Sequence, residues 1–514
     1  MNGAESLVRS LLASDVDVCF TNPGTSEMHF VAALDYVPGM RSVLALFEGV
    51  ATGAADGYWR MARKPASTLL HLGPGLANGL SNLHNAKKAG SGIVNIVGEH
   101  ASTHIALDAP LTADIEGIAR PMSAWVHTSL STADVGADAA RAVQQARTAP
   151  GRVATLILPG DTAWTEGGVV AEALMPEAPE GPDAALVEEA AKALASDNSL
   201  LLLGAGALTE ENLALAGKIA AATGCMLMSE WANPRIERGV DRVAMPRVPY
   251  PIDLALKALE PYDKIVLLGA REPIGFFAYP GKPARLTRPD ATFVPLATAA
   301  MDTGAALEAL VAATGAGAKS ALIEAAALPD LPPLSPLTPK TLAPVIANAI
   351  REGMIVVDET VSSGGHLPEA TKGAPRHSLL QNNGGSIGYG LSVSVGAAVA
   401  CPDRKVLALI SDGSGMYVPQ GLWTMAREGL DVTIVILANR AYNILRGELT
   451  NVGVQNPGPR AIDMLSLDRP TLDWVSLARG MGVEATRVED TAQLALALAA
   501  GLDTPGPVLI EAVM

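Results

Sequence analysis

Cysteine is scarce in this sequence. Only three of the 514 residues are cysteines, and Cys19, Cys225 and Cys401 lie far apart without a Cys-x-x-Cys pair. We therefore expect neither a disulfide framework nor a structural zinc site. Such cysteine usage fits a reducing compartment, so we predict that the protein works in the cytoplasm.

Basic residues are also few relative to acidic ones. The chain has 37 Lys and Arg against 53 Asp and Glu, which gives a formal net charge of −16. Because nucleic-acid binding requires a basic footprint, we expect no nucleic-acid partner. The same negative balance opposes electrostatic attraction to anionic membranes.

Long apolar runs are missing as well. Ser, Gly, Asp or Arg interrupts each apolar run before it reaches the length of about 18 residues that a transmembrane helix needs. The first ten residues, MNGAESLVRS, lack the apolar core and the cleavage site of a secretory signal. We therefore expect no membrane partner.

Apolar residues are abundant overall, at 49% of the chain, and only 18% of residues are charged. This composition predicts packed cores rather than disorder, and the length suffices for about three domains. Two proline-rich stretches, 176–182 and 328–339, divide the sequence, and such stretches connect elements more often than they form them. We predict three domains of similar size, 1–175, 183–327 and 340–514.

Short apolar runs alternate with longer Ala/Leu-rich amphipathic stretches in all three pieces. Continuous apolar runs between helices are typical of strands buried on both faces of a parallel sheet. The sequence therefore predicts an α/β protein with three doubly wound parallel-sheet domains. The expected strands lie near 17–21, 42–46, 67–71, 92–97, 153–158, 200–203, 225–228, 264–268, 293–296, 354–358, 406–411, 432–438 and 508–512.

Residues that directly follow these strands are candidates for a ligand site, because parallel α/β sheets bind ligands beyond the carboxyl ends of their strands. Asp412, Gly413 and Ser414 follow one strand, and Asn439 and Ala441 follow the next. Carboxylate, amide and carbonyl oxygens are the ligands that Mg²⁺ prefers. Gly413 and Ser414 can present backbone N–H groups to a diphosphate at a helix start. An Asp-Gly at a strand end is often only a turn, but the second strand ending in Asn favours a metal–diphosphate site.

Glu48 and His71 end two other predicted strands. The neighbours of Glu48 are small and apolar, and a carboxylate in such surroundings is suited to proton exchange. The alternative interpretation is a helix N-terminal carboxylate that complements the helix dipole. His71 can be a proton-transfer group or a hydrogen-bonded core histidine.

Together with several motifs, these residues resemble the thiamine diphosphate (ThDP)-dependent enzymes of the acetolactate synthase, pyruvate oxidase and benzoylformate decarboxylase superfamily. The Asp-Gly-Ser…Asn arrangement is similar to the metal–diphosphate signature of that family, and the resemblance covers essentially the whole chain. NPGTSE at 22–27, LALFEG around Glu48, ADGYWRMARKPA at 55–66 and His71 resemble the benzoylformate decarboxylase branch. GPGLAN at 73–78 is more similar to acetolactate synthase.

The resemblance implies a role for each site residue. Glu48 would bond to the aminopyrimidine ring of ThDP and promote loss of the thiazolium C2 proton. The carbonyl of Gly385 would hold the 4′-amino group, and Ile387 would wedge between the two rings. Thr25 and His71 would face the substrate. The implied cofactor-binding set also contains Asn22, Pro23, Gly24, Gly413, Ser414 and Asn439, and the implied Mg²⁺ ligands are Asp412, Asn439 and Ala441.

The chain departs from the family pattern in three places. Ser411 and Ala438 stand where the family usually has the first Gly of Gly-Asp-Gly and the first Asn of Asn-Asn. The benzoylformate branch also uses a second histidine from the central domain. All eight histidines here lie outside 151–350, and Phe276 and Phe277 lie near the corresponding position. Proton handling by a histidine pair is therefore not expected.

The leading interpretation is a ThDP- and Mg²⁺-dependent, non-oxidative decarboxylase of a small-molecule 2-oxo acid. The alternative is an acetolactate synthase-like carboligase, which joins the decarboxylated 2-oxo acid to a second carbonyl compound. A catalytically silent ThDP-fold protein is opposed by the presence of Glu48, Asp412 and Asn439. A Rossmann oxidoreductase is opposed by the motif at 204–206, which lacks a third glycine and a convincing downstream acid. Some relatives hold FAD in the central domain, and we expect none here.

The resemblance also implies the assembly and the substrate pocket. In this family the pyrimidine and diphosphate domains that share one cofactor come from different chains, so we expect a homodimer or homotetramer with sites between subunits. Ile444 and Leu445 would line the substrate pocket. Ile444 is β-branched and stiff, and the benzoylformate branch tends to have a small residue there. We therefore expect a short aliphatic 2-oxo acid to fit better than an aryl one.

Overall fold

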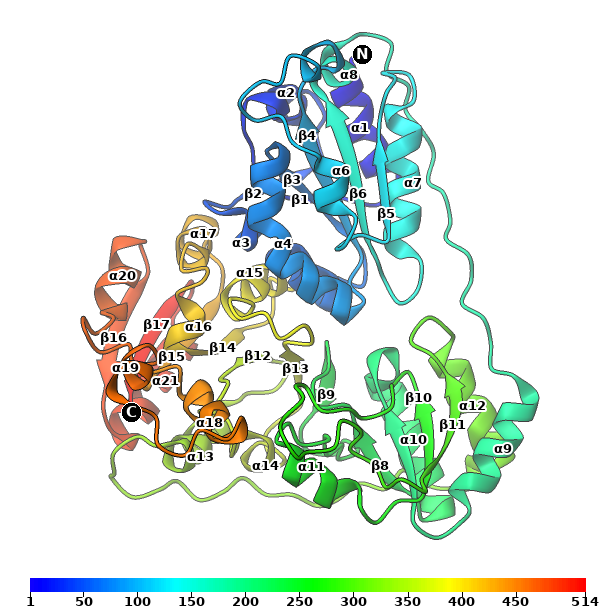
Figure 1. The fold of residues 1–514 in the computed structure, drawn as a ribbon, viewed down its shortest axis with the longest axis vertical. Helices are drawn as coiled ribbons and strands as arrows, with labels where there is room; N and C mark the ends of the chain where they lie inside the picture. Colours follow the sequence, from blue (N-terminus) through cyan, green and yellow to red (C-terminus); the bar gives the residue numbers. More distant parts are fainter.

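Three separate β-sheets, each covered by helices, form the framework of the protein (Figure 1). The computed structural model describes all of residues 1–514. Every strand pair is parallel except the pair between β13 (His377–Gln381) and β9 (Ile236–Arg238). The apolar strands are buried on both faces by helices, as the sequence pattern indicated. The predicted fold class, three α/β domains with mainly parallel sheets, is confirmed.

The N-terminal sheet has six strands in the order β2-β1-β3-β4-β6-β5. Its helices form two layers, with α1 packed against α7 and α3 packed against α4. The elements are α1 (Gly3–Ala13), β1 (Val18–Asn22), the 3₁₀ helix η1 (Thr25–Glu27), α2 (Met28–Tyr36), β2 (Arg41–Leu44), α3 (Glu48–Ala62), β3 (Ala66–Leu70), α4 (Leu72–Ala89), β4 (Ile93–Glu99), α5 (Ser102–Ile105), α6 (Ile115–Ala119), β5 (Trp125–Thr128), α7 (Val135–Arg147), β6 (Val153–Pro159) and α8 (Gly160–Trp164).

The central sheet has four strands in the order β11-β10-β7-β8. Helices α9, α10 and α12 pack together over one of its faces. The elements are α9 (Ala184–Leu194), β7 (Ser199–Leu203), η2 (Ala205–Leu208), α10 (Glu210–Thr223), β8 (Met226–Ser229), α11 (Ile252–Leu259), β10 (Lys264–Leu268), β11 (Thr292–Ala297), α12 (Thr303–Ala313) and η3 (Ala316–Ala318).

The C-terminal sheet has seven strands in the order β16-β17-β15-β14-β12-β13-β9. Strand β9 comes from the central part of the chain and pairs with the edge of this sheet, which ties the two regions together. The other elements are α13 (Pro339–Ala349), β12 (Ile355–Glu359), α14 (Leu367–Ala370), α15 (Gly390–Ala400), β14 (Val406–Ser411), α16 (Asp412–Gly415), α17 (Gly421–Glu428), β15 (Val432–Ala438), α18 (Asn443–Asn451), α19 (Pro459–Asp463), α20 (Trp474–Gly480), β16 (Glu484–Val488), α21 (Thr491–Asp503) and β17 (Val508–Val513).

Each predicted strand corresponds to an observed one, but four strands were not predicted. Strands β5 and β16 lie at sheet edges and are partly exposed, so they lack a continuous apolar run. Strand β9 has only three residues, and β13 begins with His and ends with Gln. These strands are stabilised mainly by pairing with neighbouring strands rather than by the hydrophobicity of their own residues.

Extended segments connect the three regions. Residues 167–183 contain no helix or strand and run along the outside from the N-terminal to the central sheet (Figure 1). Residues 320–335 form a second extended connection before α13. The boundaries 1–175, 183–327 and 340–514 stay our proposal for the domains. None of the helices combines the length and the apolar character needed to cross a membrane.

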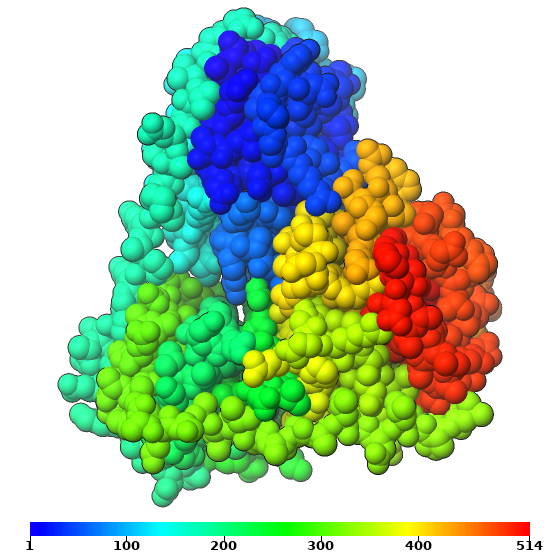
Figure 2. Space-filling model, turned by 180° about the vertical axis from the view of Figure 1, so that it is seen from behind, coloured from blue at the N-terminus to red at the C-terminus, as the bar shows by residue number.

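Helices α3 and α15 pack against each other and so join the N-terminal and C-terminal domains. Figure 2 shows the N-terminal domain, in blue, resting on the yellow and orange part of the C-terminal domain. A side chain at Gly57 would collide with the backbone of Val393, and one at Gly396 would collide with the backbone of Ala54. Glycine is therefore required at this contact, because the two helix backbones approach each other closely.

Arg60, near the end of α3, binds groups from all three domains. Its side chain is 1% exposed, and its Nε and Nη2 each lie 2.8 Å from a carboxylate oxygen of Asp56. Its Nη1 donates to the carbonyl of Pro234 at 3.1 Å, to the carbonyl of Gln381 at 2.6 Å and to the hydroxyl of Tyr389 at 3.2 Å. These partners compensate the cost of burying the Arg60 guanidinium, because a buried charge is tolerated only when it is paired and hydrogen-bonded.

We expect Arg60→Ala to lower the free energy of unfolding by about 3–5 kcal/mol, because it leaves the Asp56 carboxylate buried without its partner. Arg41→Ala is the matched control, since the exposed Arg41–Glu428 pair, at 3.3 Å, also joins the N-terminal and C-terminal domains. Its effect should stay within about 1 kcal/mol. Urea denaturation measures both, and equal losses in the two variants would contradict the central role of Arg60.

Candidate cofactor-binding and catalytic site

Glu48 and His71 lie side by side at the carboxyl edge of the N-terminal sheet. Glu48 is the first residue of α3 and is 8% exposed. Asn78 of α4 donates from Nδ2 to Glu48 Oε2 at 3.0 Å. A methyl group at Gly75 would lie 3.3 Å from Glu48 Oε1 and 3.5 Å from His71 Cβ, so this glycine borders both side chains. The structure thus brings together the two residues predicted to transfer protons.

The buried carboxylate of Glu27 bonds to one ring nitrogen of His71. Nδ1 of His71 lies 2.8 Å from Oε2 of Glu27, whose side chain is 2% exposed. The same oxygen accepts the backbone N–H of Gly24 at 2.7 Å. Burial raises the pKa of Glu27, and the neighbouring His71 opposes this rise because it favours the ionised carboxylate. The imidazole lies directly against Gly24, where a side chain would collide with the ring.

The other residues of the NPGTSE motif form the turn between β1 and η1. Asn22 Nδ2 donates to the carbonyl of Ala45 at 2.8 Å and so links the ends of β1 and β2. Pro23 and Gly24 are half-buried, whereas Thr25 is exposed. Thr25 is therefore accessible to a ligand, and its role toward substrate stays a prediction.

The predicted metal ligands come together at the ends of β14 and β15. Asp412 is 2% exposed, and its Oδ2 accepts the backbone N–H of Arg440 at 2.7 Å, which joins the two loops. Its Oδ1 accepts the backbone N–H of Gly413 at 2.9 Å. This N–H group is therefore hydrogen-bonded within the loop and does not point outward toward a diphosphate. The Ser414 hydroxyl donates to the carbonyl of Ser411 at 3.1 Å. Burial raises the pKa of Asp412.

Asn439 and Ala441 complete this set of oxygens. Oδ1 of Asn439 accepts the N–H of Ala441 at 3.0 Å, which orients the amide within the loop. No group of three or more His, Cys, Asp or Glu side chains is arranged to hold a metal anywhere in the chain. One buried carboxylate, one amide oxygen and one backbone carbonyl suit Mg²⁺, which binds few protein ligands and keeps its remaining positions for phosphate and water. The residues present therefore fit this ion.

The loop that contains Gly385 and Ile387 is held by three side chains of α4. Asn85 bonds both the carbonyl of Ser386, at 2.8 Å, and its N–H, at 3.2 Å. His84 Nε2 lies 3.1 Å from the carbonyl of Gly384, and Asn82 donates to the carbonyl of Gly388 at 3.2 Å. Within this loop Gly385 is exposed and Ile387 is half-buried. The N-terminal domain thus shapes a loop of the C-terminal domain of the same chain.

Glu359, at the end of β12, anchors the other side of this loop. Its carboxylate accepts the backbone N–H groups of Gly388 at 2.9 Å, Tyr389 at 3.0 Å and Gly390 at 2.8 Å. These three hydrogen bonds favour the ionised form, but burial outweighs them and raises the pKa of Glu359 to about 7. Glu359 therefore fixes the start of α15 and the loop that leads into it.

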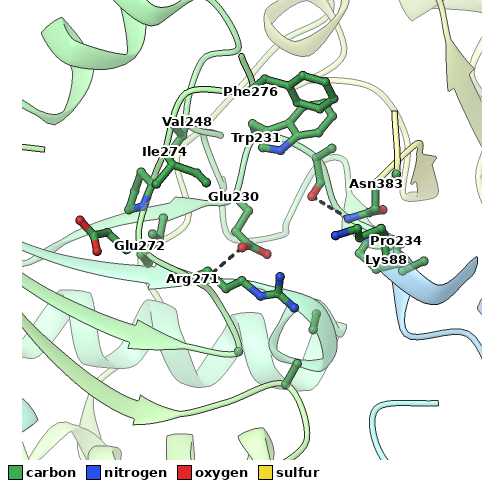
Figure 3. A pocket seen from close by; sticks show the side chains of 18 of the residues that line it. Lys88, Glu230, Trp231, Pro234, Val248, Arg271, Glu272, Ile274, Phe276 and Asn383 are labelled. Atoms are coloured by element: carbon green, nitrogen blue, oxygen red, sulfur yellow. Dashed lines mark hydrogen bonds between the residues drawn. The ribbon is translucent and has the colours of Figure 1, made fainter. Parts of the chain in front are cut away.

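A cavity of about 470 Å³ borders this loop on the side of the central domain (Figure 3). One wall carries the rings of Trp231 and Phe276, which meet edge to face with centroids 5.1 Å apart. Gly385 has a φ of +78°, and a methyl group there would lie 2.6 Å from Cζ of Phe276. Phe276 therefore lies against Gly385 and places an apolar ring where the cavity meets the predicted cofactor loop.

Glu230 and Arg271 lie on the other side of the cavity (Figure 3). The backbone N–H of Arg271 donates to Glu230 Oε1 at 3.1 Å, and burial raises the pKa of Glu230. A methyl group at Gly204 would lie 2.6 Å from Glu230 Oε2. Glu230 thus lies beside the motif at 204–206, because β7 and β8 are neighbouring strands.

The predicted substrate-pocket residues lie at the start of α18. Ile444 is half-buried and Leu445 is 44% exposed. The hydroxyl of Tyr279 donates to Glu448 of α18, so the segment that follows Phe276 lies against this helix. A hydrogen bond therefore joins the segment after Phe276 to the helix that carries Ile444 and Leu445, and the role of these two residues toward substrate stays a prediction.

Similarity to known proteins agrees with this geometry. The N-terminal TPP-binding domain of thiamine pyrophosphate enzymes matches residues 1–118, and the C-terminal TPP-binding domain of the same enzymes matches residues 364–512. A Mycobacterium tuberculosis protein with the provisional name acetolactate synthase large subunit IlvX is 47% identical over 522 residues, which cover 100% of this chain and 99% of that protein. The chain belongs to the ThDP-dependent enzyme family.

Other members of the ThDP-dependent family span nearly the whole chain. Benzoylformate decarboxylase of Pseudomonas aeruginosa is 30% identical over 520 residues, 96% of this chain and 95% of that enzyme. The ThDP-dependent 4-hydroxybenzoylformate decarboxylase of Rhodococcus jostii has a TM-score of 0.86 at 23% identity and covers 100% of this chain and 99% of that one. The structural likeness confirms the shared three-domain α/β fold.

Several residues that shape this ThDP-family site were missed in the sequence. Glu27 is part of the quoted NPGTSE motif, and Glu359 directly follows a predicted strand, so both were within the regions to inspect. Asn78, Asn82 and Asn85 recur at intervals of four and three residues, a polar stripe on one face of α4. That spacing was the signal that could have found them.

The free energy of unfolding should fall as the pH rises from about 4.5 to 7, in part because of Glu359. Its carboxyl has a pKa of about 7 in the folded protein against 4.5 unfolded, so between these values the folded state binds more protons. The contribution amounts to about 3 kcal/mol. Glu359→Gln should remove this part of the pH dependence, as measured by urea denaturation across the range. Parallel pH profiles for the two proteins would contradict the assignment.

Proposed function

We propose that this protein is a ThDP- and Mg²⁺-dependent, non-oxidative decarboxylase of 2-oxo acids, similar to benzoylformate decarboxylase. The observation that carries the proposal is that Glu48 and His71 lie on either side of a shared neighbour, Gly75, close to both. Release of an aldehyde requires one proton-transfer group for the cofactor and one for the substrate. The 30% identity to benzoylformate decarboxylase along nearly the whole chain supports the same reaction class.

Glu48 is suited to exchange a proton with the aminopyrimidine ring. Asn78 donates to its Oε2, which leaves Oε1 free to bond to the ring nitrogen. Asp412, Asn439 and Ala441 would hold Mg²⁺ and, through it, the diphosphate. When bound, ThDP supplies the nucleophilic carbon that adds to the keto group and the electron sink that allows CO₂ to leave.

His71 is suited to deliver a proton to the carbon atom from which CO₂ has left. Its Nδ1 is engaged by Glu27, so Nε2 is the nitrogen available to a substrate. The side chain is 23% exposed, which leaves part of the ring accessible. On the side of the central domain, Phe276 lies against Gly385 and offers no proton. His71 is therefore the proton donor that this site offers to the substrate.

A carboligase similar to acetolactate synthase is the second candidate. Residues 73–78 resemble that branch, and Asn78 from this motif holds Glu48. The relative from Mycobacterium tuberculosis, which is 47% identical, also carries an acetolactate synthase name. In this reading a second carbonyl compound, rather than a proton, would be joined to the fragment that remains after CO₂ leaves.

Substrate size is set, in our proposal, by Ile444 and Phe276. Ile444 is stiff and half-buried, and the bond between Tyr279 and Glu448 holds the segment after Phe276 against the same helix. The two side chains would narrow the space next to the cofactor from opposite sides. A short aliphatic 2-oxo acid should therefore fit better than an aryl one.

With ThDP and Mg²⁺ supplied, we expect CO₂ and an equal amount of aldehyde, with kcat/KM decreasing from pyruvate through 2-oxobutyrate to benzoylformate. The preference should be graded, because one methylene in an apolar pocket is worth about 1–3 kcal/mol. Ile444→Ala should shift the ranking toward benzoylformate. CO₂, aldehyde and coupled product are measured together for each substrate.

Val452→Ala is the matched control, because Val452 follows the same helix but is 49% exposed. It should leave the ranking unchanged. A coupled product in place of the aldehyde would favour the carboligase. If no 2-oxo acid releases CO₂, the proposed function is wrong, and if wild type prefers benzoylformate, only the pocket proposal is wrong.

We also propose that two subunits share each site, with Glu48 from one chain and Asp412 from its partner. Large apolar side chains are exposed on both the N-terminal and the C-terminal domain, as expected for surfaces that another chain covers. In the N-terminal domain these include Met28, Tyr36, Leu46 and Trp164, and in the C-terminal domain Tyr417, Leu445, Val452 and Met464. A homodimer or homotetramer follows from this proposal.

Glu48→Gln and Asp412→Ala should each lower turnover strongly, the first by about 10²–10⁴-fold. A dimer with one copy of each variant would have one site with both changes and one intact site, so about half of the wild-type activity should return. Co-expression with two affinity tags isolates this dimer. If it is as inactive as the single variants, the two residues serve the same site within one chain.

A further inference from the structure

In the function proposed above, Glu27 enters only as the group that bonds to His71 Nδ1, yet its side chain is among the most completely enclosed acids of the N-terminal domain, at 2% exposure. We propose that Glu27 is a positioning residue that fixes His71 in the Nδ1–H tautomer and so reserves Nε2 for the substrate. This inference rests on the proposed function of His71 as the proton donor.

The hydrogen bonds at Glu27 Oε2 determine which nitrogen of His71 carries the proton. The backbone N–H of Gly24 is a donor without alternative, and it lies 2.7 Å from Oε2. Nδ1 of His71 lies 2.8 Å from the same atom. An oxygen that already accepts one N–H and lies at this distance from Nδ1 is best satisfied as a carboxylate that accepts twice. Nδ1 is therefore the protonated nitrogen.

The surroundings of Glu27 restrict the position of its carboxylate and the groups that it can bond to. Its Oε1 is buried and has no hydrogen-bond partner. Gly98, at the end of β4, lies directly against this oxygen, where any side chain would collide with it. The bond from Gly24 also closes the turn that begins η1. The carboxylate is thus held in one position, and its hydrogen bonding is directed entirely toward Gly24 and His71.

The imidazole of His71 is fixed from two further sides. Gly24 packs against its face, and Gly75 lies next to its Cβ. With ring and tautomer both fixed, a proton can enter and leave only at Nε2, while the Nδ1 proton stays in its bond to Glu27. When Nε2 takes up a proton, the imidazolium is paired with the Glu27 carboxylate, and when Nε2 gives it up the neutral Nδ1–H tautomer returns. Glu27 itself neither gains nor loses a proton in this exchange.

Two variants separate hydrogen bonding from charge. Glu27→Ala removes the acceptor, so the Nδ1–H tautomer of His71 should no longer be enforced. Glu27→Gln can place its carbonyl oxygen at the Oε2 position and keep the bond to Nδ1–H, but it removes the negative charge. NMR of protein with ¹⁵N-labelled histidine reads the tautomer directly, and the His71 signal is identified by its loss in His71→Asn.

We expect wild type and Glu27→Gln to show the Nδ1–H tautomer, and Glu27→Ala to show the Nε2–H tautomer or a mixture. Both variants should lower kcat with little change in KM, and Glu27→Ala should lower it at least about tenfold. Glu99→Gln is the matched control, because Glu99 is a buried acid of the same domain, 7% exposed, that bonds only to the N–H of His100. It should change neither the His71 signals nor kcat.

Failure of the inference can be told apart from failure of the proposed function. If wild type shows the Nε2–H tautomer, or if Glu27→Ala keeps the Nδ1–H tautomer, Glu27 does not position His71 and the inference is overturned, whatever the activity. If the tautomers behave as expected but wild type releases no CO₂, the inference about geometry holds and the decarboxylase proposal fails. Because Glu27→Gln keeps the size and bonding of the side chain, its signals remain informative even if Glu27→Ala does not fold.

Discussion

The buried ion pair between Arg60 and Asp56 is the constraint on which the arrangement of the three domains depends. Arg60 has partners in each domain, and it lies on the same helix, α3, that begins with Glu48. The two residues are about 18 Å apart along the helix axis, since each residue rises 1.5 Å. A helix is stiff over this length, so the groups that hold Arg60 also set the position of Glu48.

Asn82 makes a second connection within the same chain, between the segment after Glu48 and the loop that contains Ile387. Asn82 of α4 donates to the carbonyl of Gly49, directly after Glu48, at 2.8 Å and to the carbonyl of Gly388, directly after Ile387, at 3.2 Å. If each site combines Glu48 of one chain with the loop of its partner, then Asn82 links residues that serve different sites. The position of the acid in one site is thereby coupled mechanically to the loop of the other.

The sequence allowed the parts that follow from strand ends to be predicted. Asp412 and Asn439 come together because their strands are parallel neighbours, so the residues after them share one edge of the sheet. Glu359 also follows a predicted strand, but its partners are backbone N–H groups of a distant segment of the same domain, so its role could not be assigned from the strand end. Asn82 binds a carbonyl of another domain, so its role depends on how the domains pack. Strand β9 was missed for the same reason, since its pairing with β13 joins two domains. Local pattern can mark such residues as candidates, but it carries no signal for the partner that each one binds in another domain.

The lack of a histidine on the side of the central domain makes the two walls of the site chemically unequal. Phe276 places an apolar ring against Gly385, whereas His71 and Glu27 stand on the side of the N-terminal domain. In the proposed function, protons would then reach the substrate from the side of His71 only. The fragment left after CO₂ departs can meet either His71 or a second carbonyl compound that enters along the apolar wall. In the function that we propose, the choice between decarboxylation and carboligation would be a competition between these two sides, and the fixed orientation of His71 would bias it toward protonation.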